Sequence, residues 1–505
     1  DLGDLADELP TTDAPGDESD DDATTPYPAG LPRPFDLTPR PGREADSADT
    51  AVTPDGATVI ASLRVPGPQE GRRVLVAIDA ATGERRTLVD LPDIDAAGPV
   101  ISHDGRTLVH VRQAKASPAG PTDVEIWVSD LDGGGARRIA DGWDRWATSL
   151  AFADDDAALI ATADSNGRAP VFRIPLDGSA PEQLTRDDFA YSDVRVVPGT
   201  ADLVALRSSW IIAPHPVRIG ADGTVTPLAS PAPATEASAR IEDVATTAAD
   251  GTRVRGWLVL PEGASESEPA PLLLWIHGGP VASFNAWSWR WNPLLAAARG
   301  YAVLLPDPGL STGYGLDFVG RGWNAWGDEP YTDLISITDA VEARADIDQT
   351  RTAAMGGSFG GYMANWVAGH PDRFRAIVTH ASLWALDQFA GTTDMTAYWT
   401  RIFTPEALAE HSPHRHLANI RTPLLVIHGD KDYRVPIGEG LRLWSDLAAA
   451  HAADDGTTVH RYLTFPDENH WILKPQNAVI WYETIFAFLD QHVHGADFQR
   501  PELLG

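Results

Sequence analysis

The first half of the chain alternates hydrophobic and polar positions in short runs, a pattern that predicts β-strands. Between residues 35 and 240 these runs are separated by turns, and a turn glycine recurs at Gly83, Gly133, Gly178 and Gly223, at spacings of 50, 45 and 45 residues. Repeats of ~40 to 50 residues built from such strands are typical of β-propeller blades. We therefore expect a partial β-propeller of about four to five blades over 35–240, with an irregular β-sandwich as the alternative.

A short run at the start of this region, Phe35-Asp36-Leu37-Thr38, resembles the last strand of a further blade. The beginning of that blade is absent, although propellers usually close with ~4 to 8 complete blades because an open edge leaves backbone groups unpaired. The chain also begins at Asp1 and not at methionine. We therefore expect an incomplete propeller cut from a longer precursor, whose N-terminal fragment would be a partner of this chain.

After residue 240 the period of the hydrophobic pattern changes. Ile241–Thr247 and Thr252–Leu260 predict an antiparallel hairpin, and apolar strands then alternate with helical patterns. The strands are Pro271–His277, Tyr301–Pro306, Thr352–Met355, Ala376–His380, Leu424–His428 and His460–Phe465; the helices include Tyr331–Arg344, Tyr362–His370, Gly438–Ala452 and Asn477–Val493. This alternation predicts a mostly parallel, doubly covered sheet over 241–505, whose reactive groups lie at the carboxyl ends of its strands.

Composition limits the partners of the 505-residue chain. Its net charge of -33 disfavours nucleic acids and anionic membranes, because both bind basic patches. The first 32 residues contain ten acidic side chains and no basic one, so we expect 1–34 to be an acidic loop or a disordered segment. No apolar run reaches the ~18 to 20 residues of a membrane helix, and no secretion leader is visible. Cysteine is absent, which excludes thiolate chemistry and agrees with a cytoplasmic location.

The motif G-x-S-x-G occurs in the segment Gly356–Gly361 and contains Ser358. A short apolar strand leads into it and an amphipathic helical pattern follows, which is the setting of a nucleophile elbow. Small residues flank the serine because the turn forces the backbone into a crowded conformation. The alternative is a glycine-rich turn with an incidental serine, so the interpretation depends on the residues around it.

A serine nucleophile needs a histidine base and an acid that orients the base, in the chain order Ser, acid, His in an α/β-hydrolase. Asp430 and Asp432 both follow the predicted strand Leu424–His428, and either carboxylate could be the acid. His470 follows the next strand and precedes the last helix, so we expect it at the same edge of the sheet. His451 on a helix and His460 in a strand fit this role less well.

The oxyanion of an acyl-transfer reaction also needs hydrogen-bond donors. The loop after the strand Pro271–His277 reads His-Gly-Gly-Pro, and Pro280 has no N–H. We therefore expect Gly279 and Phe359 to supply the backbone N–H groups of an oxyanion hole.

Two further groups of side chains are weaker candidates. Trp384 and Trp399 could line an apolar substrate pocket, although most tryptophans are expected in the core. His411, His414 and His416 form a short cluster without carboxylate or thiolate partners at ligand spacing. We therefore predict neither a metal site nor a cofactor.

Taken together, these motifs make the last ~260 residues resemble the catalytic domain of the prolyl oligopeptidase family, nearest its acylaminoacyl-peptidase branch. The matching residues are His277–Pro280, Ser311–Gly315, Trp326-Gly327, Tyr331, Asp333, Gly356–Tyr362, Asp432 with Val435-Pro436, and His470. The family pattern places the triad acid at Asp432, and a propeller before the hydrolase domain matches the family architecture.

The resemblance implies a cytoplasmic serine exo- or oligopeptidase that cleaves short peptides, acylaminoacyl-peptidase-like or aminopeptidase-like. Ser358 would attack the scissile carbonyl, His470 would transfer the proton, and Asp432 would orient the histidine. The same residues could serve an esterase or amidase, because a fold does not fix the leaving group. A catalytically silent hydrolase kept as a scaffold is the second alternative. The oligomeric state, including a homo-oligomer, stays open.

Overall fold

The computed structural model describes residues 35–39, 41–67, 70–231, 239–370 and 372–504, so the acidic segment predicted over 1–34 lies outside the described residues. The chain divides into two compact units. The first contains Glu125–Ile139 and the described residues up to Lys115, and the second contains Ala116–Val124 and the described residues from Ala140 onward. The domain boundary near residue 240 remains a prediction from the sequence.

The first unit is built from two four-stranded antiparallel sheets, each paired in chain order. The strands of one sheet are β1 (Thr50–Val52), β2 (Thr58–Val65), β3 (Arg72–Asp79) and β4 (Arg85–Val89). Those of the other are β5 (Ile94–Ile101), β6 (Thr107–Ala114), β7 (Val124–Asp130) and β8 (Arg137–Ile139). Ile60 and Leu75 of the first sheet share a buried core with Leu108 of the second. Each sheet is an up-and-down meander, the arrangement of a propeller blade.

The expected strand of a further blade at Phe35–Thr38 is absent, and this prediction is wrong. The segment contains bends, and the Thr38 N–H donates a hydrogen bond of 2.8 Å to the side chain of Asp36. This local bond turns the backbone back on itself, a conformation that competes with an extended strand.

The second unit contributes two more sheets of the same kind, which precede a larger sheet in the chain. Their strands are β9 (Ala147–Phe152), β10 (Ala158–Ala163), β11 (Val171–Pro175) and β12 (Glu182–Gln183), followed by β13 (Ala190–Val196), β14 (Leu203–Ser208), β15 (His215–Ile219) and β16 (Val225–Pro227). Ile160 and Val171 of one sheet pack with Leu203 and Val217 of the other. Four blade-like sheets are thus present among the described residues, as the glycine spacing predicts.

An eight-stranded sheet with the order β17-β18-β20-β19-β21-β22-β23-β24 forms the rest of the second unit. β17 (Ala239–Thr247), β18 (Arg253–Pro261) and β20 (Ala302–Asp307) pair antiparallel, and the remaining strands are parallel. These are β19 (Ala270–Ile276), β21 (Ile347–Gly357), β22 (Ile377–His380), β23 (Leu424–Gly429) and β24 (Arg461–Phe465). The observed strands confirm the predicted hairpin and the predicted parallel strands to within a few residues.

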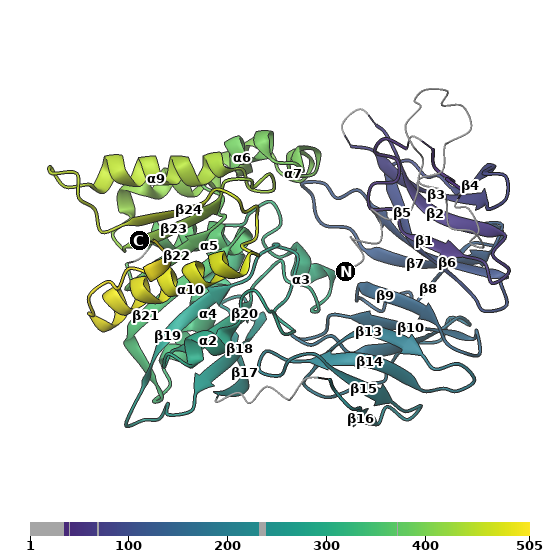
Figure 1. The fold of residues 1–505 in the computed structure, drawn as a ribbon, viewed down its shortest axis with the longest axis horizontal. Helices are drawn as coiled ribbons and strands as arrows, with labels where there is room; N and C mark the ends of the chain where they lie inside the picture. Colours follow the sequence, from purple (N-terminus) through teal and green to yellow (C-terminus); the bar gives the residue numbers. More distant parts are fainter. Residues whose placement is uncertain (1–34, 40, 68–69, 232–238, 371, 505) are drawn as a thin grey trace, which may run out of the picture. The chain divides into compact units, whose positions relative to one another are not determined.

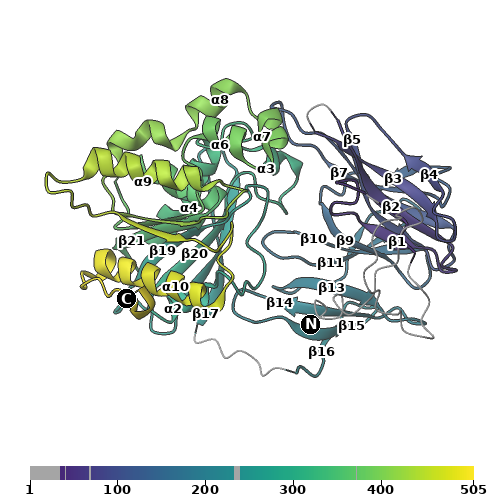
Figure 2. The same ribbon diagram turned by 45° about the horizontal axis from the view of Figure 1, so that its top comes forward.

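Helices cover both faces of this sheet (Figures 1 and 2). On one face lie α4 (Glu329–Glu342), α5 (Phe359–Ala368) and α9 (Ile437–His451), and on the other lie α2 (Pro293–Ala297) and α10 (Pro475–Leu489). Shorter helices are α3 (Leu316–Gly320), α6 (Leu386–Thr392), α7 (Thr396–Ile402), α8 (Pro405–Glu410), the 3₁₀ segments η1 (Pro413–Asn419) and η3 (Glu502–Leu504), and the π-helical segment η2 (Asp490–His494).

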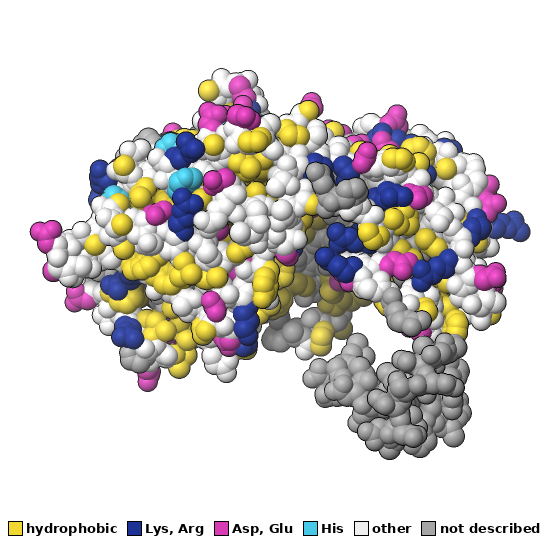
Figure 3. Space-filling view, turned by 90° about the horizontal axis from the view of Figure 1, so that it is seen from above, with side chains coloured by type: hydrophobic (Ala, Val, Ile, Leu, Met, Phe, Trp, Pro, Cys, Tyr) yellow, Lys and Arg dark blue, Asp and Glu magenta, His cyan; other side chains and the backbone are white. Residues whose placement is uncertain are grey.

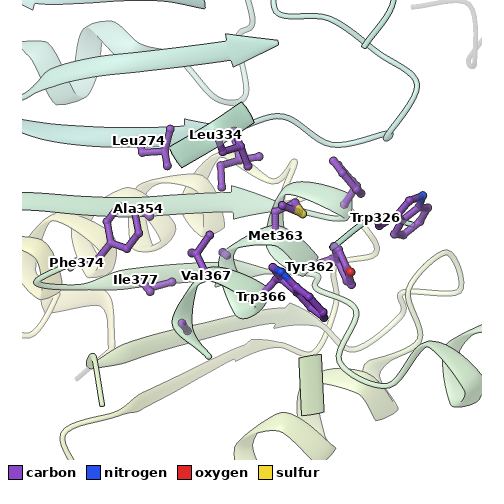
Figure 4. Packing of buried hydrophobic residues seen from close by; sticks show 14 of the residues in the cluster. Leu274, Trp326, Leu334, Ala354, Tyr362, Met363, Trp366, Val367, Phe374 and Ile377 are labelled. Atoms are coloured by element: carbon purple, nitrogen blue, oxygen red, sulfur yellow. The ribbon is translucent and has the colours of Figure 1, made fainter. Parts of the chain in front are cut away.

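The alternation of side chains along the strands divides the core into two layers. Leu272 and Leu274 of β19 belong to the cluster under α4 and α5, whereas Leu273 and Trp275 belong to the cluster under α2 and α10. Figure 4 shows the first layer, where Val367 and its neighbours on α5 face the strands. All of α5 is buried, so this layer fixes the helix that follows the serine motif.

The surface carries both signs of charge. Figure 3 shows acidic and basic side chains interspersed over one face of the molecule. Among the described residues, no helix is both long enough and apolar enough to cross a lipid bilayer.

Candidate active site

Ser358 stands on a sharp turn between β21 and α5. Its φ of 59° and ψ of -122° lie in a region that non-glycine residues occupy only under strain. The turn needs glycine at residue 360, because a Cβ there would lie 2.1 Å from the carbonyl oxygen of Ile276 at the end of β19. The Ser358 N–H donates to His380 O at 3.0 Å, and the Tyr362 N–H donates to Ser358 O at 2.8 Å. This is the geometry of a nucleophile elbow.

Asp432 is a buried carboxylate in the loop after β23. Its Oδ1 atom accepts hydrogen bonds from the N–H groups of Arg434 and Val435, each at 2.9 Å, and its Oδ2 atom lies 2.7 Å from His470 Nδ1. Burial by itself raises the pKa of Asp432, but hydrogen bonds from His428 and His470 outweigh burial and hold the pKa well below its usual value. The carboxylate is therefore ionised at neutral pH, and it fixes the proton of His470 on Nδ1.

His470 and Ser358 line one cavity of about 620 Å³. Because Nδ1 of His470 donates to Asp432, its Nε2 atom is the acceptor that can take a proton. No hydrogen bond joins the Ser358 hydroxyl to the His470 ring in this conformation, and such bonds often tighten only when substrate binds. Asp430, the other candidate for the acid, has an exposed side chain, and its N–H donates to Phe465 O at 2.9 Å.

The two expected oxyanion donors both lie at the cavity. Gly279 is in the loop after β19 with φ of 133°, and Phe359 is the first residue of α5. Neither N–H donates a hydrogen bond to another group in the part of the chain that the structure describes. The loop runs beside the serine, because a Cβ at Gly278 would lie 3.4 Å from Ser358 Cβ. Two backbone N–H groups without another acceptor thus lie at the cavity that Ser358 lines.

A buried carboxylate, which sequence reasoning did not find, supports this wall of the cavity. Asp307, the last residue of β20, accepts from the Phe284 N–H at 2.8 Å, from the Ser283 hydroxyl at 3.1 Å and from the Tyr314 hydroxyl at 2.5 Å. The guanidinium of Arg255 lies 3.4 Å from the same carboxylate, and both side chains are fully buried. This network holds the segment around residue 284 against the sheet. The only sequence signal was an acid at the carboxyl end of a strand.

The cavity has an aromatic wall that includes Trp399 and Phe389, and the role of Trp399 in a substrate pocket stays a prediction. The prediction for Trp384 is wrong, because its side chain is fully buried in the core and does not line this cavity. Its Nε1–H donates to Asp446 at 2.7 Å and its backbone N–H donates to Glu439 at 2.7 Å. Both partners lie on α9, which draws the indole away from the cavity.

Sequence reasoning assigned no role to several charged and aromatic residues of the cavity. Arg290, Trp291, Arg434 and Trp471 also line it. The one signal that could have found the first two was the tryptophan-rich run just after the His-Gly-Gly-Pro loop.

The short histidine cluster has structural contacts. The rings of His411 and His416 pack against the indole of Trp366, with centroids 6.0 and 4.9 Å away. Within the described ranges, no group of three or more His, Asp or Glu side chains is arranged to hold a metal ion.

This sheet order and its elbow define an α/β-hydrolase fold, here preceded by blade-like β-sheets. Residues 287–496 match the sequence profile of the prolyl oligopeptidase family, so the chain contains a domain of this family. The predicted resemblance to the family is confirmed.

Curated relatives extend the similarity beyond this domain. The chain is 32% identical over 435 residues to a probable dipeptidyl-peptidase 5 of Emericella nidulans, covering 79% of this chain and 57% of the relative. It is 30% identical over 437 residues to dipeptidyl-peptidase 5 of Aspergillus fumigatus, covering 81% and 58%. The chain thus spans less than two thirds of the length of these relatives.

Solved structures agree on the fold. The acylaminoacyl peptidase of Pyrococcus horikoshii superposes with a TM-score of 0.74 at 18% identity, covering 90% of this chain and 72% of that one. A puromycin-hydrolyzing peptidase of Mycobacterium tuberculosis gives a TM-score of 0.67 at 22% identity, covering 90% and 80%. The expected fold class, propeller blades followed by an α/β-hydrolase domain, is confirmed.

Proposed function

We propose that this protein is a serine peptidase that cleaves short peptides through an acyl-enzyme. The observation that carries the proposal is the pairing of a strained Ser358 with His470 in one cavity, where the buried Asp432 holds the histidine at 2.7 Å. In this arrangement each residue has a distinct chemical task.

The reaction begins when the Ser358 hydroxyl attacks the scissile carbonyl carbon and His470 Nε2 takes its proton. The ring is then an imidazolium, which the ionised Asp432 stabilises. His470 returns this proton to the leaving amine as the carbon–nitrogen bond breaks, and the acyl group remains on the serine. Water then attacks the ester carbonyl while His470 takes a proton from it. His470 returns this proton to the Ser358 oxygen as the ester bond breaks, which releases the acid product and restores the serine hydroxyl.

The negative charge that develops on the carbonyl oxygen needs donors that are already in position. We assign this role to the N–H groups of Gly279 and Phe359, neither of which has another acceptor among the described residues. One such donor contributes ~3 to 4 kcal/mol to the stability of the transition state.

The substrate class follows from the cavity and from the relatives. A volume of about 620 Å³ suits a ligand of short-peptide size, and aromatic residues such as Phe389, Tyr398 and Trp399 suit an apolar side chain. The sequence relatives are named dipeptidyl-peptidase 5, and a structural neighbour is an acylaminoacyl peptidase. We therefore propose an exo- or oligopeptidase that acts on short peptides whose N-terminus is either free or acylated.

The test is a panel of chromogenic substrates on the wild type and on Ser358→Ala: dipeptidyl, acetyl-aminoacyl and free aminoacyl anilides, and a p-nitrophenyl ester. Anilide hydrolysis that disappears in the alanine variant supports the peptidase, and the preferred N-terminal group names its subclass. Serine-dependent turnover of the ester alone indicates an esterase. If none of the anilides and not the ester is hydrolysed, the protein is a catalytically silent scaffold and the proposal fails.

Other predictions from the sequence keep that status. They are the domain division at about residues 34 and 240, the cytoplasmic location, the fragment of a longer precursor and a homo-oligomer. Native mass spectrometry of the purified protein measures the last two directly.

A further inference from the structure

The cavity that contains Ser358 and His470 also contains a cation without an acidic partner. The Arg290 guanidinium forms no ion pair or hydrogen bond with any residue that the structure describes, and its Nε atom is buried without a partner. Arg434 in the same cavity is different, because its Nε atom lies 2.8 Å from the Asp394 carboxylate. In a chain of net charge -33, a half-buried arginine without an acid is an unused anion-binding group.

Two indole rings hold this guanidinium in place. Its Cζ atom lies 4.5 Å from the ring centroid of Trp291 and 4.2 Å from that of Trp471. Trp291 is fixed in turn against the elbow, since a Cβ at Gly357 would lie 2.7 Å from its ring. Stacking on two aromatic rings orients the guanidinium and leaves its N–H edge free for a ligand. Burial lowers the pKa of Arg290, but a guanidinium stays protonated in proteins.

The position of Arg290 indicates which part of the substrate it contacts. Trp471, on which the guanidinium stacks, directly follows His470 in the chain. In the proposed mechanism His470 gives its proton to the leaving amine, so the leaving segment of the peptide lies next to His470. The wall formed by Trp471 and Arg290 therefore faces the residues that follow the scissile bond.

A planar guanidinium with free donors matches the geometry of a carboxylate, which it can bind through two parallel hydrogen bonds. A peptide offers a carboxylate in two places, at its C-terminus and on acidic side chains. We propose that Arg290 binds a carboxylate in the leaving segment and so selects peptides that carry one shortly after the scissile bond. This inference rests on the proposed peptidase function and specifies its substrate class.

The test compares tetrapeptides of one sequence that end in a free acid or in an amide, with a third peptide that ends in an amide and carries glutamate directly after the scissile bond. Product formation is followed by chromatography. A hydrogen bond to a charged group changes kcat/KM by about 10- to 100-fold, so the wild type should prefer at least one carboxylate peptide by this factor. The preferred peptide identifies the carboxylate as terminal or as a side chain.

Variants separate a binding role from a structural one. Arg290→Met keeps the apolar stem between the two indoles and should lose the preference. The readout is the ratio of kcat/KM for the carboxylate peptide to kcat/KM for the amide peptide, which a uniform change in activity does not alter. Arg290→Lys should keep part of the preference. The matched control is Arg299→Met, since Arg299 also stacks on an aromatic ring, with Cζ 4.8 Å from Phe486, but lies outside this cavity.

The inference is overturned if the wild type cleaves all three peptides equally, or if Arg290→Met keeps the preference. Absence of serine-dependent anilide hydrolysis in the wild type would instead contradict the proposed function, so the two failures are distinguishable.

Discussion

Replacing Asp432 by asparagine tests whether this carboxylate is the acid of the triad. The perturbation is nearly isosteric and removes one negative charge, 2.7 Å from His470 Nδ1. The charge centres of a carboxylate and an imidazolium in such contact are about 4 Å apart, and at an effective dielectric constant of ~20 their attraction is about 4 kcal/mol. Because the imidazolium forms only during the reaction, this energy is lost from the transition state alone. We expect kcat to fall about 10³-fold with little change in KM.

The matched control is Asp430→Asn in the same loop. Because the Asp430 side chain is exposed, we expect kcat of this variant to change less than 2-fold. Steady-state anilide hydrolysis gives kcat and KM for both variants, and circular dichroism with thermal unfolding verifies that each is folded. A large loss in the Asp430 variant together with an active Asp432 variant would refute the assignment. Equal activity of both variants would refute the triad itself.

Two substitutions test the packing behind the site. The methyl group added by Gly360→Ala would lie 2.1 Å from the carbonyl oxygen of Ile276 and displace the elbow, so kcat/KM should fall by about 10²-fold or more. The control is Gly391→Ala, which should leave kcat/KM unchanged because nothing lies within 4 Å of the new Cβ. Burial raises the pKa of Glu439 from 4.5 to about 7 against opposing hydrogen bonds from backbone N–H groups. The native state therefore binds the proton more tightly than the unfolded state, and stability falls as pH rises from about 4.5 to 7, by about 3 kcal/mol in total. Glu439→Gln should remove this loss, so urea midpoints that differ from the wild type by the same amount at pH 5 and pH 8 would contradict it.

Local signals predicted the elements and the elbow. The apolar strands and the helices after residue 240 were placed to within a few residues, because burial on both faces leaves a continuous hydrophobic pattern. The sequence predicted that the backbone is closely packed at Gly356 and Gly360, since only a crowded turn needs so many small residues around Ser358. The order of Ser358, the acid and His470 along the chain followed from the fold class.

Features that depend on contacts between distant segments were not readable. The local pattern allows either Asp430 or Asp432 as the acid, and only the resemblance to the family favours Asp432. Burial and the contact with His470 distinguish the two carboxylates in the structure. Trp384 follows a strand as a pocket residue would, but two acceptors on α9 hold it in the core. Arg290 is recognisable only from the lack of an acidic partner in its neighbourhood. The segment Phe35–Thr38 has the pattern of a strand, yet a local hydrogen bond turns it.

The most direct test of the central claim, that Ser358 is an activated nucleophile, is covalent labelling with a fluorophosphonate. We expect one adduct per chain by intact mass, located on Ser358 by peptide mapping. Labelling should disappear in Ser358→Ala and slow strongly in His470→Ala, which remains able to fold because the ring lies at the cavity wall. A wild-type protein that stays unlabelled, or an adduct on another residue, would show that Ser358 is not an activated nucleophile.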